Sequence, residues 1–344
     1  MLPQLKYPAD LRSLIFVAIA YFLLFFPLLH PIPNYLTLIW ITASSFLCFI
    51  GGAINHNHKH LPIFENPKIN HLFNIILTLC LGRSATEIVV PHNYNHHLYR
   101  GSENDWINPQ LAGTGLGIIR LPRYIVQSLI NIAKRKRTSE AQTECISILN
   151  KTNNLTLLGN RQQATGNREK RFSAQKNVFA NMRCSPQTLP DDEQQSLQRE
   201  KLTLRLFILI LIILSGWKFL IFTLIPWAVG IASLLGINLL QHEGCQPKSR
   251  YQNSRNFTSP LGNWLLFNNG YHTIHHLRPT LHWTLLPAAH ERIVQPHIDA
   301  QLEVRSILKY LLFDYFFQHS PFANSKTLTS PDNLVAEITP KSNG

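Results

Sequence analysis

The sequence contains few cysteines, and they are scattered. Cys48, Cys80, Cys145, Cys184 and Cys245 are odd in number among 344 residues, and none forms a Cys-x-x-Cys pair. This pattern excludes a disulfide framework and argues against a zinc–thiolate or rubredoxin-like site. A bound metal would therefore depend on other side chains, and the part of the chain that binds it is expected to face a reducing compartment.

Charge is also scarce and unevenly divided. Charged residues make up 15% of the chain, and 32 Lys and Arg outnumber 19 Asp and Glu, giving a formal net charge of +13. The mean hydropathy of −0.03 averages very apolar segments with very polar ones. A basic balance can indicate nucleic-acid binding, but it is also typical of positive loops beside a membrane. Because the apolar segments are long, we expect a membrane and no nucleic acid.

Four apolar runs have a length that suits membrane spans. They cover 13–29, 35–54, about 203–223 and 226–241, and an uncharged run of this length can cross the hydrocarbon core as a helix. The first run follows Lys6 and Arg12, as in a cleaved signal peptide. It is long for that role, however, and no small-x-small cleavage site precedes the next apolar run.

The four runs predict two hairpins. The first turns at 30–34 and the second at Pro226, and neither turn is charged, whereas most Lys and Arg lie at the other ends. The positive-inside rule therefore predicts that both termini and the histidine-rich segments are cytoplasmic. The predicted fold class is an all-α membrane protein with four transmembrane helices in two hairpins and a cytoplasmic, histidine-rich helical cap.

The remaining segments divide the chain further. The interrupted apolar stretches 70–90 and 111–133 are expected to lie along the membrane interface. Residues 134–201 hold 13 Lys and Arg against 7 Asp and Glu, a net +6 (13 − 7), and predict a flexible polar insertion. Its opening run Lys134–Arg137 is a candidate site either for docking an acidic protein or for binding anionic lipid headgroups. We therefore expect a membrane domain formed by 1–133 and 202–320, the insertion 134–201, and a tail at 321–344.

Three histidine clusters lie beside apolar runs. On a helix, residues four apart share a face and residues two apart do not. The spacing therefore pairs His56 with His60 and leaves His58 in doubt. It also pairs His92 with His96, displaces His97 by one residue, and directs the third cluster to one face. That third cluster consists of His272, His275 and His276.

A further pair, Asn238 and His242, ends the last apolar run with the same four-residue spacing. Together with the clusters this gives nine histidines and one amide, enough for more than one metal ion, since imidazole binds iron, copper, zinc and nickel. The alternatives are interfacial polar residues and a zinc hydrolase. The first is disfavoured because clustered polar groups near hydrocarbon are costly, and the second because such sites need only about three protein ligands.

The clusters and the apolar hairpins resemble the membrane fatty acid desaturase and alkyl hydroxylase superfamily. The similarity lies in His56-x-x-x-His60, His92-x-x-x-His96-His97 and His272-x-x-His275-His276, with Asn238-x-x-x-His242 matching an additional motif of acyl desaturases. It covers about 1–133 and 202–300. One departure is that the second cluster has three intervening residues, as in alkane hydroxylases, where most desaturases have two.

The resemblance implies two non-haem iron ions held by these residues, with molecular oxygen as co-substrate. It implies a desaturase that introduces a double bond into a fatty acyl chain. The alternative is a related hydroxylase or ketolase acting on an alkane, carotenoid or other lipid. Neither the acyl carrier nor the position oxidised follows from the sequence.

The electron source is expected to be a separate protein, a ferredoxin, a rubredoxin or a small b-type cytochrome, because the sequence holds no His-Pro-Gly-Gly haem motif and no cysteine-rich carrier. Asp105 and Glu243 are candidate acceptors for the second N–H of ligand imidazoles. The alternative for both is an ordinary polar residue near the interface.

Overall fold

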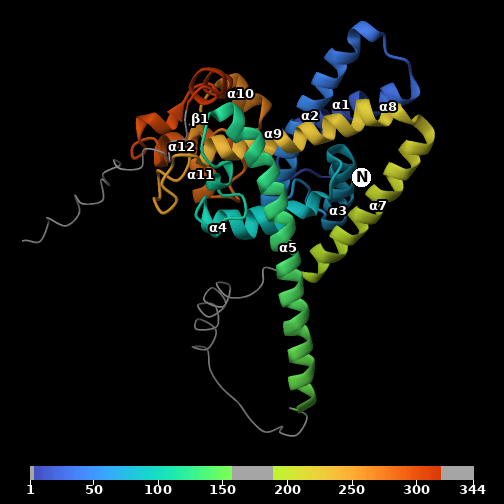
Figure 1. The fold of residues 1–344 in the computed structure, drawn as a ribbon, viewed down its shortest axis with the longest axis horizontal. Coiled ribbons are helices and arrows are strands. Elements are labelled where there is room, and N and C mark those ends of the chain that lie inside the picture. The colour runs from blue at the N-terminus through green and yellow to red at the C-terminus, as the bar shows by residue number, and fades with distance from the viewer. Residues whose placement is uncertain (1–3, 157–188, 319–344) are drawn as a thin grey trace, which may run out of the picture.

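A computed structural model describes residues 4–156 and 189–318 of the chain. In this part the protein is mostly helical, with almost no strand (Figure 1). The amino-terminal elements are η1 (Pro8–Asp10), α1 (Leu11–Leu29), α2 (Asn34–His60), α3 (Pro67–Leu81), η2 (Ala85–Ile88), η3 (Val89–His96), α4 (His97–Tyr99), η4 (Pro109–Ala112) and α5 (Gly117–Thr156). The next are α7 (Asp191–Ser215), α8 (Trp217–Phe219), η5 (Leu220–Leu224) and α9 (Ile225–His242). The remainder comprises β1 (Asn256–Phe257), α10 (Pro260–Leu265), α11 (His272–Leu277), η6 (Trp283–Leu285), α12 (Leu286–Ile293), η7 (Ala300–Leu302), β2 (Glu303–Val304), α13 (Ile307–Lys309) and η8 (Tyr310–Tyr315).

Three helical stretches among the described residues are long and apolar enough to cross a membrane. They are Pro8–Leu29, Asn34–His60 and Trp217–His242, and they contain the predicted spans 13–29, 35–54 and 226–241. A fourth candidate is the pair Pro67–Leu81 and Ala85–Tyr99, which is bent by 86°.

The turn of the predicted second hairpin, placed at Pro226, is wrong. Pro226 lies inside a helical stretch that runs from Trp217 to His242, directly after the π-helical η5, and it does not end that helix. The chain instead reverses at Gly216, whose φ of 54° and ψ of −128° are open mainly to glycine. The predicted span 203–223 is therefore divided between α7 and the following helix.

Helices α2 and α9 pack closely because small residues face each other's side chains. A Cβ atom at Gly230 would lie 2.6 Å from the Cβ of Cys48, and one at Gly52 would lie 2.2 Å from Leu234 Cδ1. Small residues let helix backbones approach where no hydrophobic force acts between helices in lipid. Since α2 ends at His60 and α9 at His242, this packing brings two of the predicted ligand segments together.

The bend between α3 and η2 is held by a buried carboxylate from α7. Glu200 accepts hydrogen bonds from the Ser84 hydroxyl, from Thr86 N at 2.9 Å and from Thr86 Oγ1 at 2.6 Å. Lys59 Nζ donates to the same Thr86 hydroxyl at 2.9 Å. Glu200 therefore ties α7 to the turn that leads into the second histidine cluster.

Helix α5 runs at a steep angle to α9 (Figure 1). Several apolar side chains along it are exposed, including Ile118, Val126 and Leu129. Two parts of the predicted insertion are helical, 134–156 within α5 and 191–201 within α7. Residues 157–188 and the predicted tail 321–344 lie outside the described residues, and the predicted domain division remains a prediction.

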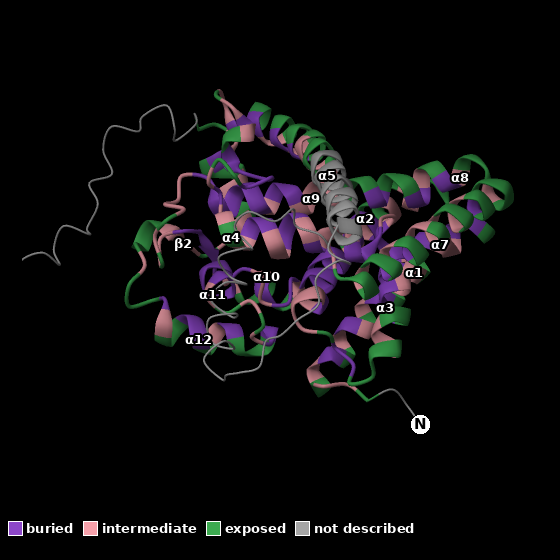
Figure 2. Ribbon diagram, turned by 90° about the horizontal axis from the view of Figure 1, so that it is seen from below, coloured by how far each residue is buried: buried purple, intermediate pink, exposed green. Residues whose placement is uncertain are grey.

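The carboxyl-terminal elements cover the ends of α2 and α9. Strands β1 and β2 pair in parallel, and the residues of α11 from His272 to His276 are all buried (Figure 2). An apolar cluster that includes Ile54, Leu77, Phe267 and Ile274 joins these elements to the membrane helices. The third histidine cluster is thus fixed against the ends of the spans.

Replacing Glu200 by Gln should lower the apparent melting temperature of the purified protein. Gln presents an N–H group to hydroxyls that donate to the carboxylate, and each unsatisfied buried group costs about 1–3 kcal/mol. A thermal melt in detergent checks this, with Asp192→Asn as the control, since Asp192 is exposed on the same helix. Equal melting temperatures for Glu200→Gln and the wild type would show that this carboxylate does not stabilise the bend.

Candidate metal centre

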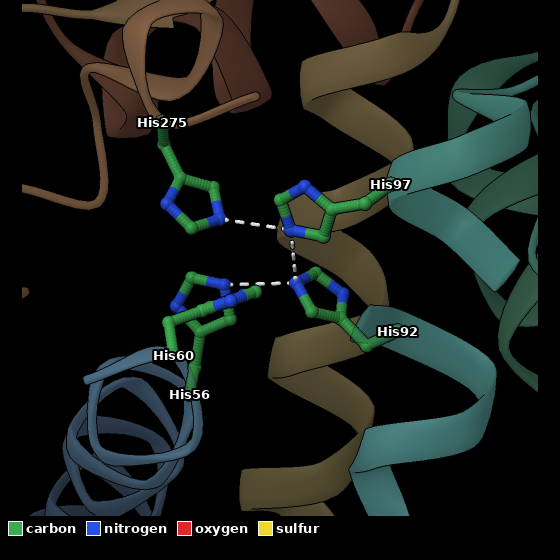
Figure 3. A group of neighbouring side chains, drawn as sticks. All are labelled: His56, His60, His92, His97 and His275. Carbon is green, nitrogen blue, oxygen red and sulfur yellow. Dashed lines mark hydrogen bonds between the residues drawn. The ribbon is translucent and has the colours of Figure 1, made fainter. Parts of the chain in front are cut away.

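Nine histidines gather into two groups in which the ring nitrogens lie within 4.8 Å of one another. The first group comes from the ends of α2, η3, α4 and α11, and its rings point toward a common centre (Figure 3). It contains His56, His60, His92, His97 and His275. The second group, which is wholly buried, contains His96, His242, His272 and His276.

The contacts within the first group suit a metal ion. His92 Nε2 lies 2.9 Å from His56 Nε2 and 3.1 Å from His97 Nε2, and His97 Nε2 lies 3.1 Å from His275 Nε2. A neutral imidazole has one N–H and one lone pair, so these nitrogens cannot all be paired with one another. Two imidazoles bound at about 2.1 Å and at right angles would place their nitrogens about 3.0 Å apart. His60 Nε2 is buried without a hydrogen-bond partner among the described residues.

The second group has the same spacing. His242 Nε2 lies 3.0 Å from His96 Nε2, 2.9 Å from His272 Nε2 and 3.2 Å from His276 Nε2. Burial, together with the neighbouring imidazoles, holds the pKa of His272 and of His276 well below the ordinary value. The rings are therefore neutral, with lone pairs free to bind a metal.

The second cluster differs from the predicted pairing because it lies in a π-helix. Hydrogen bonds in η3 run from i to i+5, and this wider turn brings residues five apart toward the same face, whereas in an α-helix they point away from each other. His92 therefore joins His97 in the first group, whereas His96 joins the second. The prediction that His92 pairs with His96 was wrong because it assumed α-helical spacing. The wider turn also absorbs the additional residue of this cluster.

The other two clusters follow α-helical spacing. His56 and His60 lie in one group, as their four-residue spacing predicts, and so do His272 and His276. His275 belongs to the opposite group, so the third cluster contributes to both rather than to a single face. His58 lies in neither group: its Nδ1 accepts from Ile63 N at 3.3 Å.

Asp105 contacts one of the grouped histidines and Glu243 does not. Asp105 Oδ2 lies 2.6 Å from His96 Nδ1, and both side chains are fully buried. Burial raises the pKa of Asp105, but the His96 imidazole and the hydrogen bonds from His96 and Ile107 outweigh it and lower the pKa. The ionised carboxylate can thus fix the His96 ring with Nε2 toward the group. Glu243 instead forms a buried ion pair with Arg120.

Asn238 lies in the same region but in a different setting. Its Nδ2 donates to Tyr124 Oη at 2.7 Å and to Ile107 O at 3.3 Å. The amide nitrogen is therefore used, which leaves the oxygen as the atom that could face a metal. Tyr124, which orients this amide, had no signal in the sequence, because it lies in an interrupted apolar stretch.

A second residue that the sequence does not indicate is Asn253. Its backbone carbonyl lies 3.1 Å from His242 Nδ1 and so accepts the second N–H of that ring. A backbone acceptor can be supplied by any residue type, so only the fold reveals it. Two rings of the second group, those of His96 and His242, are thus oriented by groups from other segments.

An apolar cavity of about 380 Å³ reaches the histidines. His56, His92 and His272 line it, together with Asn238 and Gln241. Most of its wall is apolar and comes from α2, α5 and α9, and includes Phe49, Leu129, Ile132, Ile231, Leu234 and Leu235. A long apolar molecule in this cavity would lie against members of both histidine groups.

Replacing Asp105 by Asn should weaken metal binding by roughly 10- to 100-fold, the usual effect of removing a carboxylate that orients a ligand imidazole. Titration of the metal-free, full-length protein with ferrous ion measures this. Glu103→Gln is the control, because Glu103 is exposed two residues away. Unchanged affinity in Asp105→Asn would mean that the 2.6 Å contact with His96 has no part in metal binding.

Comparison with known proteins assigns the chain to a family. The family model described as Fatty acid desaturase matches residues 30–305, which is well over half of the sequence. No curated protein matches the sequence significantly. The matched range includes both histidine groups and the helices that form the cavity. The chain belongs to the fatty acid desaturase family, within the superfamily of membrane desaturases and hydroxylases.

Proposed function

We propose that the chain is an oxygen-dependent di-iron desaturase that introduces a double bond into a fatty acyl chain. The observation that supports this most directly is the lining of the apolar cavity. Its histidines come from both groups, His56 and His92 from the first and His272 from the second. An acyl chain in the cavity would therefore lie beside both candidate iron positions.

The overall reaction balances with a separate reductant. The acyl chain loses two C–H hydrogens and gains one C=C bond, while one molecule of oxygen is reduced to two molecules of water. Of the four electrons required, two come from the acyl chain and two from a donor protein, and two protons come from solvent. Iron held by the histidines would supply the activation of oxygen and the removal of hydrogen from an unactivated carbon.

The proposed iron ligands are the nine grouped histidines together with the oxygen of Asn238. The histidine ring nitrogens of each group face one another. The Asn238 nitrogen donates to Tyr124 and Ile107, so its oxygen is the atom that could bind iron. Asp105 and the carbonyl of Asn253 hold two of the rings. Iron is favoured over zinc because nine imidazoles exceed the roughly three protein ligands of a catalytic zinc site.

The cavity wall positions the substrate and excludes water. Side chains such as Leu235 and Ile132 have no polar group to bind water, so an acyl chain is held by dispersion and by burial of its methylene groups. Burial of each methylene stabilises the bound state by about 0.8 kcal/mol. A dry wall also protects a reactive oxidant from solvent.

We further propose an orientation with both termini and the histidine groups in the cytoplasm. The turns at the far ends of the spans are nearly uncharged, and the basic segments lie at the histidine end, in accordance with the positive-inside rule. A soluble ferredoxin, rubredoxin or small b-type cytochrome would then supply electrons from the cytoplasmic side.

A hydroxylase or ketolase is the alternative. The additional residue in the second cluster left this reaction open, but a π-helix accommodates that residue with His92, His96 and His97 still in the groups. The spacing therefore no longer distinguishes between the two reactions.

Expression in a host of defined lipid composition, followed by mass spectrometry of lipid extracts, tests the proposal. A product lighter by two mass units than its parent acyl chain is expected. His276→Ala should abolish it, whereas His58→Ala should retain it, because His58 lies outside both groups. A product heavier by sixteen mass units would show that the protein is a hydroxylase and not a desaturase. The absence of oxidised lipid in every acyl class would contradict both proposals.

A further inference from the structure

The last turn of helix α9 is held by residues from elsewhere in the chain. The last four carbonyl groups of an α-helix have no N–H partner within the helix. In α9 two of these four accept from one arginine: Leu240 O accepts from Arg255 Nη1 at 2.6 Å, and Gln241 O accepts from Arg255 N at 2.6 Å. The other two accept from backbone N–H groups that directly follow the helix. Arg255 therefore completes the end of α9 with both its backbone and its side chain.

A second buried arginine contacts the same turn from α5. Arg120 forms the ion pair with Glu243, the residue that follows His242. Arg255 Nη1 also lies 3.3 Å from the Glu243 carbonyl oxygen, and all three of these charged side chains are buried. The Glu243 carboxylate offsets one of the two positive charges, and the carbonyl oxygens at a helix end carry a partial negative charge that favours a cation there. The turn that carries His242 thus contacts two buried guanidinium groups.

Two tyrosine rings from the carboxyl-terminal segment η8 cover these guanidinium groups. Arg255 Cζ lies 4.7 Å from the centroid of the Tyr310 ring, and Arg120 Cζ lies 4.9 Å from that of Tyr315. Such cation–π contacts are stronger where water is excluded. Backbone hydrogen bonds also join the end of η8 to the start of α5. The carboxyl-terminal segment is therefore attached to the same turn of α9 through both arginines.

His242 is the ring for which this attachment matters most. Its Nε2 lies 3.0, 2.9 and 3.2 Å from the Nε2 atoms of the other three rings of the second group. Asn253, whose carbonyl accepts from His242 Nδ1, lies two residues before Arg255. Ligand distances in a metal site vary by only about 0.2 Å. A small movement of the end of α9 would therefore displace one ring relative to all of its partners.

We propose that Arg255 and Arg120, covered by Tyr310 and Tyr315, are positioning residues for the second histidine group. They fix the last turn of α9, and with it the direction of His242. This inference rests on the proposed function, in which the second group binds one of the two irons. It makes the carboxyl-terminal segment part of the metal centre, although that segment supplies none of the ligands.

Cobalt(II) titration of metal-free, full-length protein in detergent tests this, because the visible absorption of cobalt(II) reports its binding. The two groups are measured separately. Replacing His60 and His97 by Ala leaves only the second group to bind, and replacing His272 and His276 by Ala leaves only the first. Each variant below is titrated in both backgrounds.

Arg255→Gln should weaken cobalt(II) binding to the second group by about tenfold, as expected for loss of a group that holds a ligand imidazole in place. Binding to the first group should be unchanged. Tyr310→Leu, which keeps an apolar cover over Arg255, should weaken the second group by about threefold. Arg250→Gln is the matched control, since Arg250 also lies over a tyrosine ring, that of Tyr251 at 5.2 Å, but is exposed.

Ordinary capping of α9 would make the opposite prediction. If Arg255 only stabilised the fold, Arg255→Gln would lower the melting temperature and weaken both groups equally. That result, or an unchanged affinity of the second group in Arg255→Gln, would overturn the inference.

Metal binding is measured separately from turnover, so the two proposals can fail separately. If the wild type oxidises lipid but Arg255→Gln binds cobalt(II) normally in the second group, only the positioning role is wrong. If Arg255→Gln weakens the second group alone but the wild type oxidises no lipid, the desaturase proposal fails while the positioning role stands.

Discussion

The structure depends on the convergence of nine imidazole rings in two buried groups at the ends of α2 and α9. Without an ion, neighbouring ring nitrogens about 3 Å apart lack enough protons to pair with one another. The arrangement is maintained by close helix packing at Gly52 and Gly230. It is also maintained by groups that contact the Nδ1 atom of a single ring, such as Asp105 at His96. The fold therefore supplies preformed ligand sets, and a metal ion would remove the polar conflict within them.

The cavity gives an apolar molecule access to both histidine groups. It brings an apolar wall against rings of both groups, and its lining also includes Arg83 and Glu87 at the α3–η2 bend and Lys136 on α5. That bend is fixed by Glu200 through Ser84 and Thr86. One turn thus positions the second histidine cluster and places Arg83 at the cavity, so the geometry of the metal centre and that of the cavity are set by the same segment.

Much of the fold and most of the site could be predicted from the sequence, because hydrophobic run length and histidine spacing are local signals. All nine grouped histidines are among those that the sequence indicates, and His58, which the spacing leaves in doubt, lies in neither group. Prediction from the sequence failed where backbone geometry departs from the regular α-helix: the π-helix that pairs His92 with His97, and the turn at Gly216 rather than Pro226. It could not choose between Asp105 and Glu243, since a carboxylate's partner is decided by tertiary packing and not by its neighbours in the chain.

Iron content per chain tests the central claim most directly. Full-length protein purified after loading with ferrous ion should contain two irons, one for each histidine group, and His58→Ala should contain the same number. His60→Ala should contain fewer, because His60 Nε2 faces the first group without another partner among the described residues. A wild-type protein with one iron, or with zinc in both positions and undiminished lipid oxidation, would contradict the account.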